Sequence, residues 1–270
     1  MILPRSLLAL VFCFPVTVAA ADDSAAWYRN AFQAGVGLSV TGGLGVVGGY
    51  YNPELENSVL RYFGFRTSLS TTDPLKSAID SLIERFMKDG RDVGDGIKID
   101  EGKLDAWHGN LFLDYYPFRG PWRLTAGYAW GAMELDSKIF GTIEGAPTQR
   151  FYFYLAGDHY YYNGNNFKGS ATIDWNYHGP YLGTGFDFKI FCGFSFFIDA
   201  GVVFTNRPAK LNLDIPHEQL YIYNKETGVW GPVAIPILDR DVANAQRDAN
   251  RKLSDFKFYP MLKAGFAYRF

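Results

Sequence analysis

The sequence predicts an all-β fold, an eight-stranded antiparallel β-barrel that spans a membrane through its strands, and three observations favour it. Eight segments alternate apolar side chains with polar or small ones at a period of two, which is the period of a strand with two different faces. The chain is 17% aromatic and has 29 glycines and a mean hydropathy of -0.10, a composition typical of barrels in which lipid-facing and lumen-facing residues alternate. The connections between segments are short at one end and, with one exception, long at the other.

The first residues carry the pattern of a cleaved export signal. Arg5 precedes an apolar run from Leu7 to Val18, and small residues follow at Ala19 to Ala21. We therefore expect residues 1–20 to be a signal peptide and residues 21–270 to form one barrel domain. No later stretch offers about eighteen consecutive apolar residues, so no transmembrane helix is predicted. The mature chain then keeps a single cysteine, Cys192, which excludes an internal disulfide.

Turn residues separate the alternating segments. A Thr41-Gly42-Gly43 turn follows the first segment, and an Arg119-Gly120-Pro121 turn joins the fourth to the fifth. The third segment alternates less regularly, and its pattern places Arg61, Phe63 and Phe65 on one face. The predicted strands cover residues 31–40, 44–51, 59–69, 107–118, 122–133, 180–189, 194–205 and 256–270.

An amphipathic helix is predicted over residues 73–89, in the connection between the third and fourth strands. Asp73 provides the N-cap, Pro74 stands in the first turn, and Gly90 follows the last turn. The apolar residues at helical spacing are Leu75, Ile79, Leu82, Ile83, Phe86 and Met87. The helix thus belongs to one of the long external loops.

Two further connections are long, residues 134–176 and 207–255. The first contains the tyrosine-rich stretch FYFYLAGDHYYYNGNN, which is expected to form a hairpin of its own beyond the membrane. The second ends in the charged stretch DVANAQRDANRKL, which is expected to be helical. Five tyrosines of the first stretch are candidates for a surface that contacts a host protein, a glycan or lipopolysaccharide, unless the hairpin packs on itself: Tyr152, Tyr154, Tyr160, Tyr161 and Tyr162.

The last strand, FKFYPMLKAGFAYRF, places Phe266, Tyr268 and Phe270 on one face. It resembles the closing strand of bacterial outer-membrane β-barrels, whose final aromatic residue is read by the assembly machinery. Together with the segments YYPF, WRLTAGY, PYLGTGF and FSFFIDAGVVF, it makes the chain similar to small Gram-negative outer-membrane proteins built broadly like the OmpA and OmpW barrels. This resemblance implies a bacterial outer-membrane location, with the barrel-assembly machinery, membrane lipid and lipopolysaccharide as partners. It implies no established activity.

The predicted lumen face carries charges of both signs: Arg61, Asp114, Arg123, Asp187, Asp199, Lys257, Lys263 and Arg269. In a narrow tube these charges are expected to pair, because an unpaired buried charge costs several kcal/mol. The interpretation that follows is a structural plug of salt bridges. The alternative is a narrow small-solute pore, in which five bases facing three acids give a weak anion preference.

Composition and motifs exclude several other functions. A net charge of -2 argues against nucleic acid, and the acidic run 89–101 lacks the spacing of a calcium-binding loop, so no cofactor or metal is expected. Some barrels of this size are outer-leaflet lipid-modifying enzymes, but none of the four histidines shares a strand face with a serine two positions away. We therefore expect a structural or surface-interaction protein rather than an enzyme. A soluble exported β-sandwich is the alternative fold.

Overall fold

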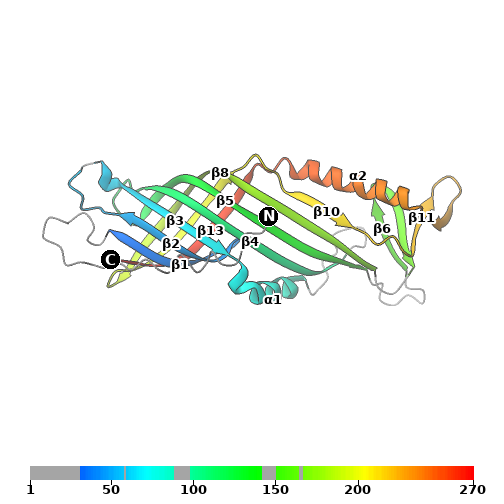
Figure 1. Ribbon diagram of the computed structural model, residues 1–270, viewed down its shortest axis with the longest axis horizontal. Coiled ribbons are helices and arrows are strands. Elements are labelled where there is room, and N and C mark those ends of the chain that lie inside the picture. Colours follow the sequence, from blue (N-terminus) through cyan, green and yellow to red (C-terminus); the bar gives the residue numbers. More distant parts are fainter. Residues whose placement is uncertain (1–30, 58, 88–97, 142–149, 164–166) are drawn as a thin grey trace.

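The structure is a computed structural model that describes residues 31–57, 59–87, 98–141, 150–163 and 167–270. Eight antiparallel strands close into a ring in the order β8-β5-β4-β3-β2-β1-β13-β9, with β9 paired back to β8 (Figure 1). The closed ring confirms the predicted eight-stranded barrel. Its strands are β1 (Phe32–Ser39), β2 (Gly43–Tyr51), β3 (Phe63–Thr71), β4 (Lys98–Tyr115), β5 (Trp122–Gly141), β8 (Phe167–Phe191), β9 (Phe194–Phe204) and β13 (Phe258–Arg269).

The two ends of the barrel differ. At one end, here called the turn end, β2–β3, β4–β5 and β8–β9 are joined by the shorter connections that the sequence predicts. The backbone nitrogen of Phe270 donates to the carbonyl of Phe32 at 2.9 Å, so the last residue lies at the turn end as well. The opposite end, here called the loop end, carries the long connections and the tight turn between β1 and β2. This asymmetry is the one expected of an outer-membrane barrel.

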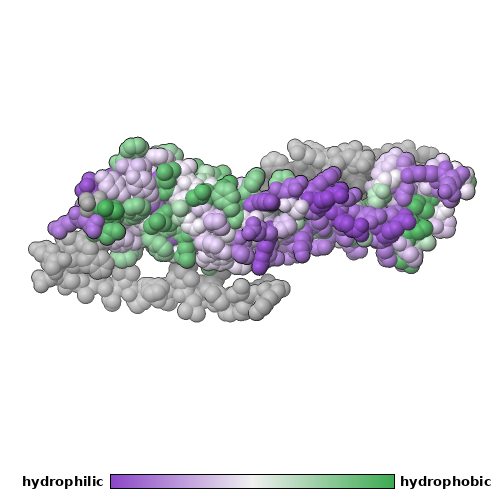
Figure 2. Space-filling view, turned by 90° about the horizontal axis from the view of Figure 1, so that it is seen from above, coloured by the Kyte–Doolittle hydropathy of each residue, from purple (hydrophilic) through white to green (hydrophobic). Residues whose placement is uncertain are grey.

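The outer wall of the barrel is apolar and the inner wall is not. On β13, buried and exposed residues alternate, with Lys263 buried and Leu262 and Phe266 exposed, as the period of two predicts. In Figure 2 apolar residues are frequent over the barrel, whereas hydrophilic residues dominate much of the part that extends beyond it. The exposed apolar belt contains Phe32, Leu38, Phe65, Leu111, Leu113, Leu124, Leu182, Phe186, Ile198, Phe204, Leu262, Phe266 and Tyr268.

Three barrel strands run far beyond the ring at the loop end. β4, β5 and β8 include residues that the sequence assigned to loops, and β10 (Lys210–Asp214) pairs with residues 170–174 of β8. These extensions escaped prediction because their residues are mostly polar on both faces, as in the stretch Glu134–Lys138 of β5. Backbone pairing with a neighbouring strand, rather than an apolar face, keeps them extended.

A second, four-stranded sheet with the order β12-β11-β7-β6 follows the extensions. Leu238 of helix α2 (Ile235–Leu253) is fully buried in a core with residues of this sheet, including Phe153, Tyr160 and Leu220. The structure confirms the predicted tyrosine-rich hairpin and the predicted helix; the sheet and α2 are here called the distal module (Figure 1). Its strands are β6 (Arg150–Leu155), β7 (Asp158–Asn163), β11 (Leu220–Asn224) and β12 (Val229–Pro232).

Helix α1 (Lys76–Met87) lies against β4, where the Nζ atom of Lys76 contacts the carboxylate of Asp105 at 2.8 Å. The predicted start at Asp73 is a 3-10 turn, η3 (Asp73–Leu75), and residues 88–97 lie outside the described part of the chain. A further 3-10 turn, η2 (Leu60–Tyr62), precedes β3. Within the described ranges, neither α1 nor α2 is long and apolar enough to cross a membrane.

Candidate functional site

A layer of ionic contacts crosses the lumen near the turn end. Arg66 on β3 binds two carboxylates: its Nη1 atom lies 2.8 Å from Asp199 on β9, and its Nε and Nη2 atoms both contact Asp114 on β4. These contacts are charge-assisted and, at Asp114, bidentate, which is the strong geometry for an arginine and a carboxylate. Arg66 and Asp199 are each 4% exposed, so water screens the contacts little.

Arg123 on β5 is the second cation of this layer. Its Nη2 atom lies 2.5 Å from Asp199 and its Nη1 atom lies 2.5 Å from Asp187 on β8, while its Nε atom is 3.4 Å from Asp114. The side chain of Arg123 is fully buried, and so is Asp114. We call Arg66, Arg123, Asp114, Asp187 and Asp199 the charge layer. Every acid in it contacts an arginine, so no carboxylate of the layer is buried without a counter-charge.

Neutral donors add hydrogen bonds to two carboxylates of the charge layer. The hydroxyl of Thr125 donates to Asp114 at 2.6 Å, and the hydroxyl of Tyr116 donates to Asp187 at 2.9 Å. Since small β-barrels have an interior just wide enough for side chains, five charged groups with these partners occupy much of the cross-section. The layer therefore braces five strands against one another.

Aromatic side chains fill the lumen between the charge layer and the loop end. Phe112 and Tyr181 stack with ring centroids 4.4 Å apart, and Tyr177 and Tyr259 stack at 4.0 Å. All four rings are buried. Beside them Lys263 is 7% exposed, and its Nζ atom donates to the hydroxyl of Ser68 at 2.8 Å. The lumen in this region is a packed interior in which polar and aromatic side chains interdigitate.

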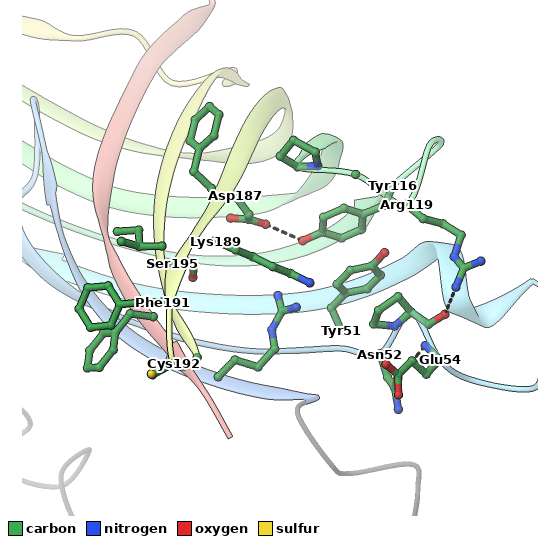
Figure 3. Close-up of a pocket in the computed structure, with 18 residues that line it drawn as sticks. Tyr51, Asn52, Glu54, Tyr116, Arg119, Asp187, Lys189, Phe191, Cys192 and Ser195 are labelled. Carbon is green, nitrogen blue, oxygen red and sulfur yellow. Dashed lines mark hydrogen bonds between the residues drawn. The ribbon is translucent and has the colours of Figure 1, made fainter.

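A cavity of about 670 Å³ opens at the turn end, on the other side of the charge layer (Figure 3). Tyr51 and Tyr116 stack face to face in its wall with ring centroids 3.8 Å apart. Three cationic side chains line it, from the β4–β5 turn, from β8 and from the end of β13: Arg119, Lys189 and Arg269. This cavity, here called the mouth cavity, is hollow where the rest of the lumen is filled.

The structure brings Asp114, Arg123, Asp187 and Asp199 together, places Lys263 in the adjacent buried region and places Arg269 in the mouth cavity. Arg61 and Lys257 are corrections to the predicted lumen set. Arg61 lies in η2 before β3 begins, with its guanidinium 5.3 Å from the ring of Tyr62, and Lys257 is exposed just before β13.

Arg66 is the lumen cation that the sequence prediction missed. The signal for it was the alternation of Gly64, Arg66, Ser68 and Ser70, which are small or polar, with Phe63 and Phe65 on the opposite face. The prediction puts Arg61 in the lumen and with it Phe63 and Phe65, which share its face, and this assignment is wrong because Phe65 faces outward with 49% exposure. A shift of one residue exchanges the two faces of a strand.

The tyrosines predicted as candidates for a contact surface differ in how deeply they are buried. Tyr160 is fully buried and its hydroxyl donates to Asp241 of α2 at 2.5 Å, and the buried Tyr161 stacks on Tyr221. These two do not form a contact surface; as the alternative of internal packing expects, Tyr160 packs against α2 and Tyr161 against rings of the same sheet. Tyr162 is partly buried against the core of the distal module, and Tyr154 is 47% exposed. The side chain of Tyr152 lies outside what the structure describes.

The remaining predicted positions fall in two places. Phe266, Tyr268 and Phe270 all point outward near the turn end. Most of the acidic run 89–101 lies outside the described residues, and within the described ranges no group of three or more potential metal ligands is found. The charge layer and the mouth cavity are therefore the two sites that the described residues offer.

No family model and no curated protein matches this sequence. Among solved structures, it is similar to CarO of Acinetobacter baumannii, with a TM-score of 0.53 and 17% identity over 88% of this chain and 97% of that chain. CarO2 of the same organism gives a TM-score of 0.52 and 15% identity over 89% and 98%. A major outer membrane protein of Thermus thermophilus gives a TM-score of 0.41 and 12% identity over 89% and 100%.

At these identities the similarity to the two Acinetobacter proteins concerns the fold alone, and it agrees with the closed ring of eight strands. The chain thus has the fold of a small outer-membrane β-barrel. The more specific likeness to OmpA and OmpW barrels stays a prediction.

Proposed function

We propose that the protein is an integral outer-membrane barrel that does not conduct, and that its filled lumen makes it a rigid support for the distal module at the cell surface. The observation that carries this proposal is the Arg66–Asp199 contact, which joins strands on opposite sides of the lumen between the packed aromatic region and the mouth cavity. The barrel strands β4, β5 and β8 continue past the loop end and lead to the distal module. A barrel whose lumen is filled and whose strands extend to a folded module is better suited to holding that module than to transporting a solute.

The outer-membrane location is supported by the apolar belt. Large side chains such as Leu182 on β8 (55% exposed) and Phe266 on β13 (54% exposed) point away from the barrel. In water such a contiguous apolar surface would favour association, whereas lipid covers it without cost. The short connections at the turn end then face the periplasm, and the distal module faces outward. Export by the expected signal peptide at residues 1–20 is part of this proposal.

The proposal of a closed lumen rests on the energetics of the charge layer. A solute that passed through the barrel would have to separate Arg66 or Arg123 from the carboxylates that they contact. Separating a buried ion pair leaves uncompensated charges, which costs about 3–5 kcal/mol when one partner is removed. The anion preference expected from five bases against three acids also loses its basis, because the charge layer itself holds two arginines and three aspartates.

Planar-bilayer recording tests the closed lumen. The mature protein, with insertion verified by heat-modifiable gel migration, should give no discrete openings. Openings in the wild-type protein that Asp199→Ala abolishes, and that Arg240→Ala on the exposed face of α2 leaves unchanged, would establish the narrow pore instead. Cell-surface exposure of the distal module is tested separately by the labelling experiment at the end of the Discussion.

A further inference from the structure

The mouth cavity has the size and shape of a ligand site. Its volume of about 670 Å³ falls within the range of roughly 300–1,000 Å³ typical of small-molecule pockets. The β2–β3 connection, the β4–β5 turn and the β8–β9 hairpin surround it, so three separate pairs of strands hold its walls (Figure 3). The charge layer closes its inner side, because Asp187 belongs to both.

The cavity carries surplus positive charge. Asp187 is already bound by Arg123 and Tyr116, which leaves Glu54 as the other acid of the lining against three cations, Arg119, Lys189 and Arg269. Within the described part of the chain, none of these three cations forms an ion pair. Three cations gathered at one mouth without a paired acid attract an anion.

Two of the three cations are held in place by neutral groups. The guanidinium of Arg269 lies 5.6 Å from the centre of the Tyr51 ring, and its Nη2 atom donates to Gln33 at 3.3 Å. Arg119 donates to the carbonyl of Pro53 at 2.7 Å, as the dashed line in Figure 3 shows. These contacts orient the two guanidinium groups and leave their charges uncompensated. Guanidinium groups are suited to binding phosphate or carboxylate oxygens through two parallel hydrogen bonds.

Tyr51 provides an independent sign of a missing acceptor. Its side chain lines the cavity and is 5% exposed, yet its hydroxyl has no hydrogen-bond partner among the residues that the structure describes. Tyr116, which stacks on it, donates its own hydroxyl to Asp187. Leaving a buried hydroxyl without a partner costs free energy, so the Tyr51 hydroxyl is available to a water or a ligand that can accept from it. An oxygen of a bound anion would accept this hydrogen bond.

The rim of the cavity also contains strained backbone. Arg119 (φ 52°) and Cys192 (φ 43°) adopt left-handed conformations, which residues other than glycine rarely adopt. Both residues stand in tight turns between strands, where such conformations are common, and Ala156 (φ 51°) in the β6–β7 turn adopts one as well. Here the left-handed Arg119 stands at the tight turn that directs its side chain toward Pro53.

We propose that the mouth cavity binds an oxyanion, a phosphate or carboxylate group of a small solute or of a lipid headgroup, through Arg269, Lys189 and the hydroxyl of Tyr51. The cavity lies at the end of the barrel, so the ligand enters from the water at the turn end without crossing the charge layer. The site is a property of the mouth alone and is independent of whether the lumen conducts.

Isothermal titration calorimetry of the mature protein in an uncharged detergent, with inorganic phosphate at constant ionic strength, tests the site. The wild-type protein should bind phosphate saturably. Arg269→Gln should weaken binding about tenfold or more, since a hydrogen bond to a charged group is lost, and Lys189→Gln and Tyr51→Phe should each weaken it severalfold. Lys252→Gln, which removes the same charge from an exposed lysine at the end of α2, should leave binding unchanged.

Heat-modifiable migration verifies that each variant is folded; should Arg269→Gln fail to fold, the exposed Lys189 supplies the decisive variant. The source of the oxyanion is resolved by repeating the titration in nanodiscs of phosphatidylcholine and of phosphatidylglycerol. Weaker apparent phosphate binding in phosphatidylglycerol identifies a lipid headgroup, and equal binding identifies a free solute. The proposal is overturned if the wild-type protein shows no saturable phosphate binding. It is also overturned if Lys252→Gln weakens phosphate binding as much as Arg269→Gln does.

Discussion

Arg66 on β3 and Asp199 on β9 meet at 2.8 Å, although their strands stand four places apart in either direction around the ring. No pair of strands in an eight-membered ring is farther apart. Two side chains are therefore long enough to cross the lumen at the charge layer. Their contact joins two strands that share no backbone hydrogen bonds.

The first prediction concerns the Arg66–Asp199 contact. Arg66→Leu should lower the free energy of unfolding by about 3–5 kcal/mol, because it leaves Asp114 and Asp199 buried with only Arg123 as counter-charge. The measurement is the urea midpoint for loss of heat-modifiable migration in lipid vesicles. Arg61→Leu is the matched control and should change stability by no more than about 0.5 kcal/mol. Equal effects of the two substitutions would contradict the register of β3 described above.

The difference between Arg61 and Arg66 shows what the sequence can and cannot specify. The alternation of β13 is regular up to the last residue, so its register was predictable, and Lys263 is buried as expected. At β3 the chain enters the strand through η2, and a short helical turn carries no period of two. Arg61 lies in this turn, so treating it as a strand residue that faces the lumen assigned Phe65 to the wrong face.

The distal module was predictable in its elements but not in its packing. The hairpin at 150–163 and the part of α2 at 241–253 both follow from local pattern, whereas the first turns of α2, from Ile235, do not. That α2 covers the hairpin depends on contacts between Tyr160 and Asp241, which are 81 residues apart in the chain. A cluster of tyrosines indicates either a surface or a core, and only the position of α2 distinguishes the two. The mouth cavity likewise joins residues from Tyr51 to Arg269, and no local motif marks it.

The second prediction tests the apolar belt. Leu182→Arg places a charge on the outer wall and should destabilise the barrel in lipid by about 2–4 kcal/mol if the residue lies near the bilayer midplane. Val229→Arg is the matched control, since Val229 is similarly exposed (62%) but lies in the distal module. The assay is folding yield into vesicles together with urea titration. If Leu182→Arg lowers the folding yield and the stability no more than Val229→Arg does, this wall of the barrel is not inserted in the membrane.

The third prediction concerns alkaline pH. Burial raises the pKa of Tyr160 above its usual value, and its hydrogen bond to Asp241 raises it further. Neutral Tyr160 therefore stabilises the distal module below about pH 10, the pKa of an unfolded tyrosine, and this contribution is lost as the pH rises through the higher folded pKa. Proteolysis of the module should accelerate over that alkaline range, and Tyr160→Phe should reduce the pH dependence. Tyr154→Phe, on the exposed face of the same hairpin, should retain the wild-type pH dependence of proteolysis. If both substitutions change this pH dependence equally, it does not arise from Tyr160.

The fourth prediction concerns assembly in cells, which the aromatic end of the chain is proposed to direct. Phe270 donates its backbone nitrogen to Phe32, and Phe270→Ala keeps this hydrogen bond while removing the ring. The amount of folded barrel in cells should be severalfold lower for this variant than for the wild type. The purified variant should refold from urea into detergent as the wild type does. Phe258→Ala removes an equally outward-facing ring at the start of the same strand and is the control. A folding defect of Phe270→Ala in detergent would assign the ring a structural role instead.

The fifth prediction tests the orientation of the barrel, on which the proposed surface role depends. Cys192 is exposed in the β8–β9 connection at the turn end, so the wild-type protein carries its own label site at the end that the proposal places in the periplasm. A membrane-impermeant maleimide should leave Cys192 unmodified in intact cells and modify it after lysis. Lys225→Cys in a Cys192→Ser background places a thiol at an exposed position in the distal module, next to Asp158, and should be modified in intact cells.

The two thiols report opposite ends of the same barrel, which makes each the control for the other. Because the strands hold both ends in one rigid ring, insertion in the opposite direction must exchange the two labelling patterns. Modification of Cys192 together with protection of Lys225→Cys in intact cells would place the distal module in the periplasm. The surface role would then be excluded, while the mouth cavity, which depends only on the turn-end residues, would face the exterior and keep its predicted affinity for oxyanions.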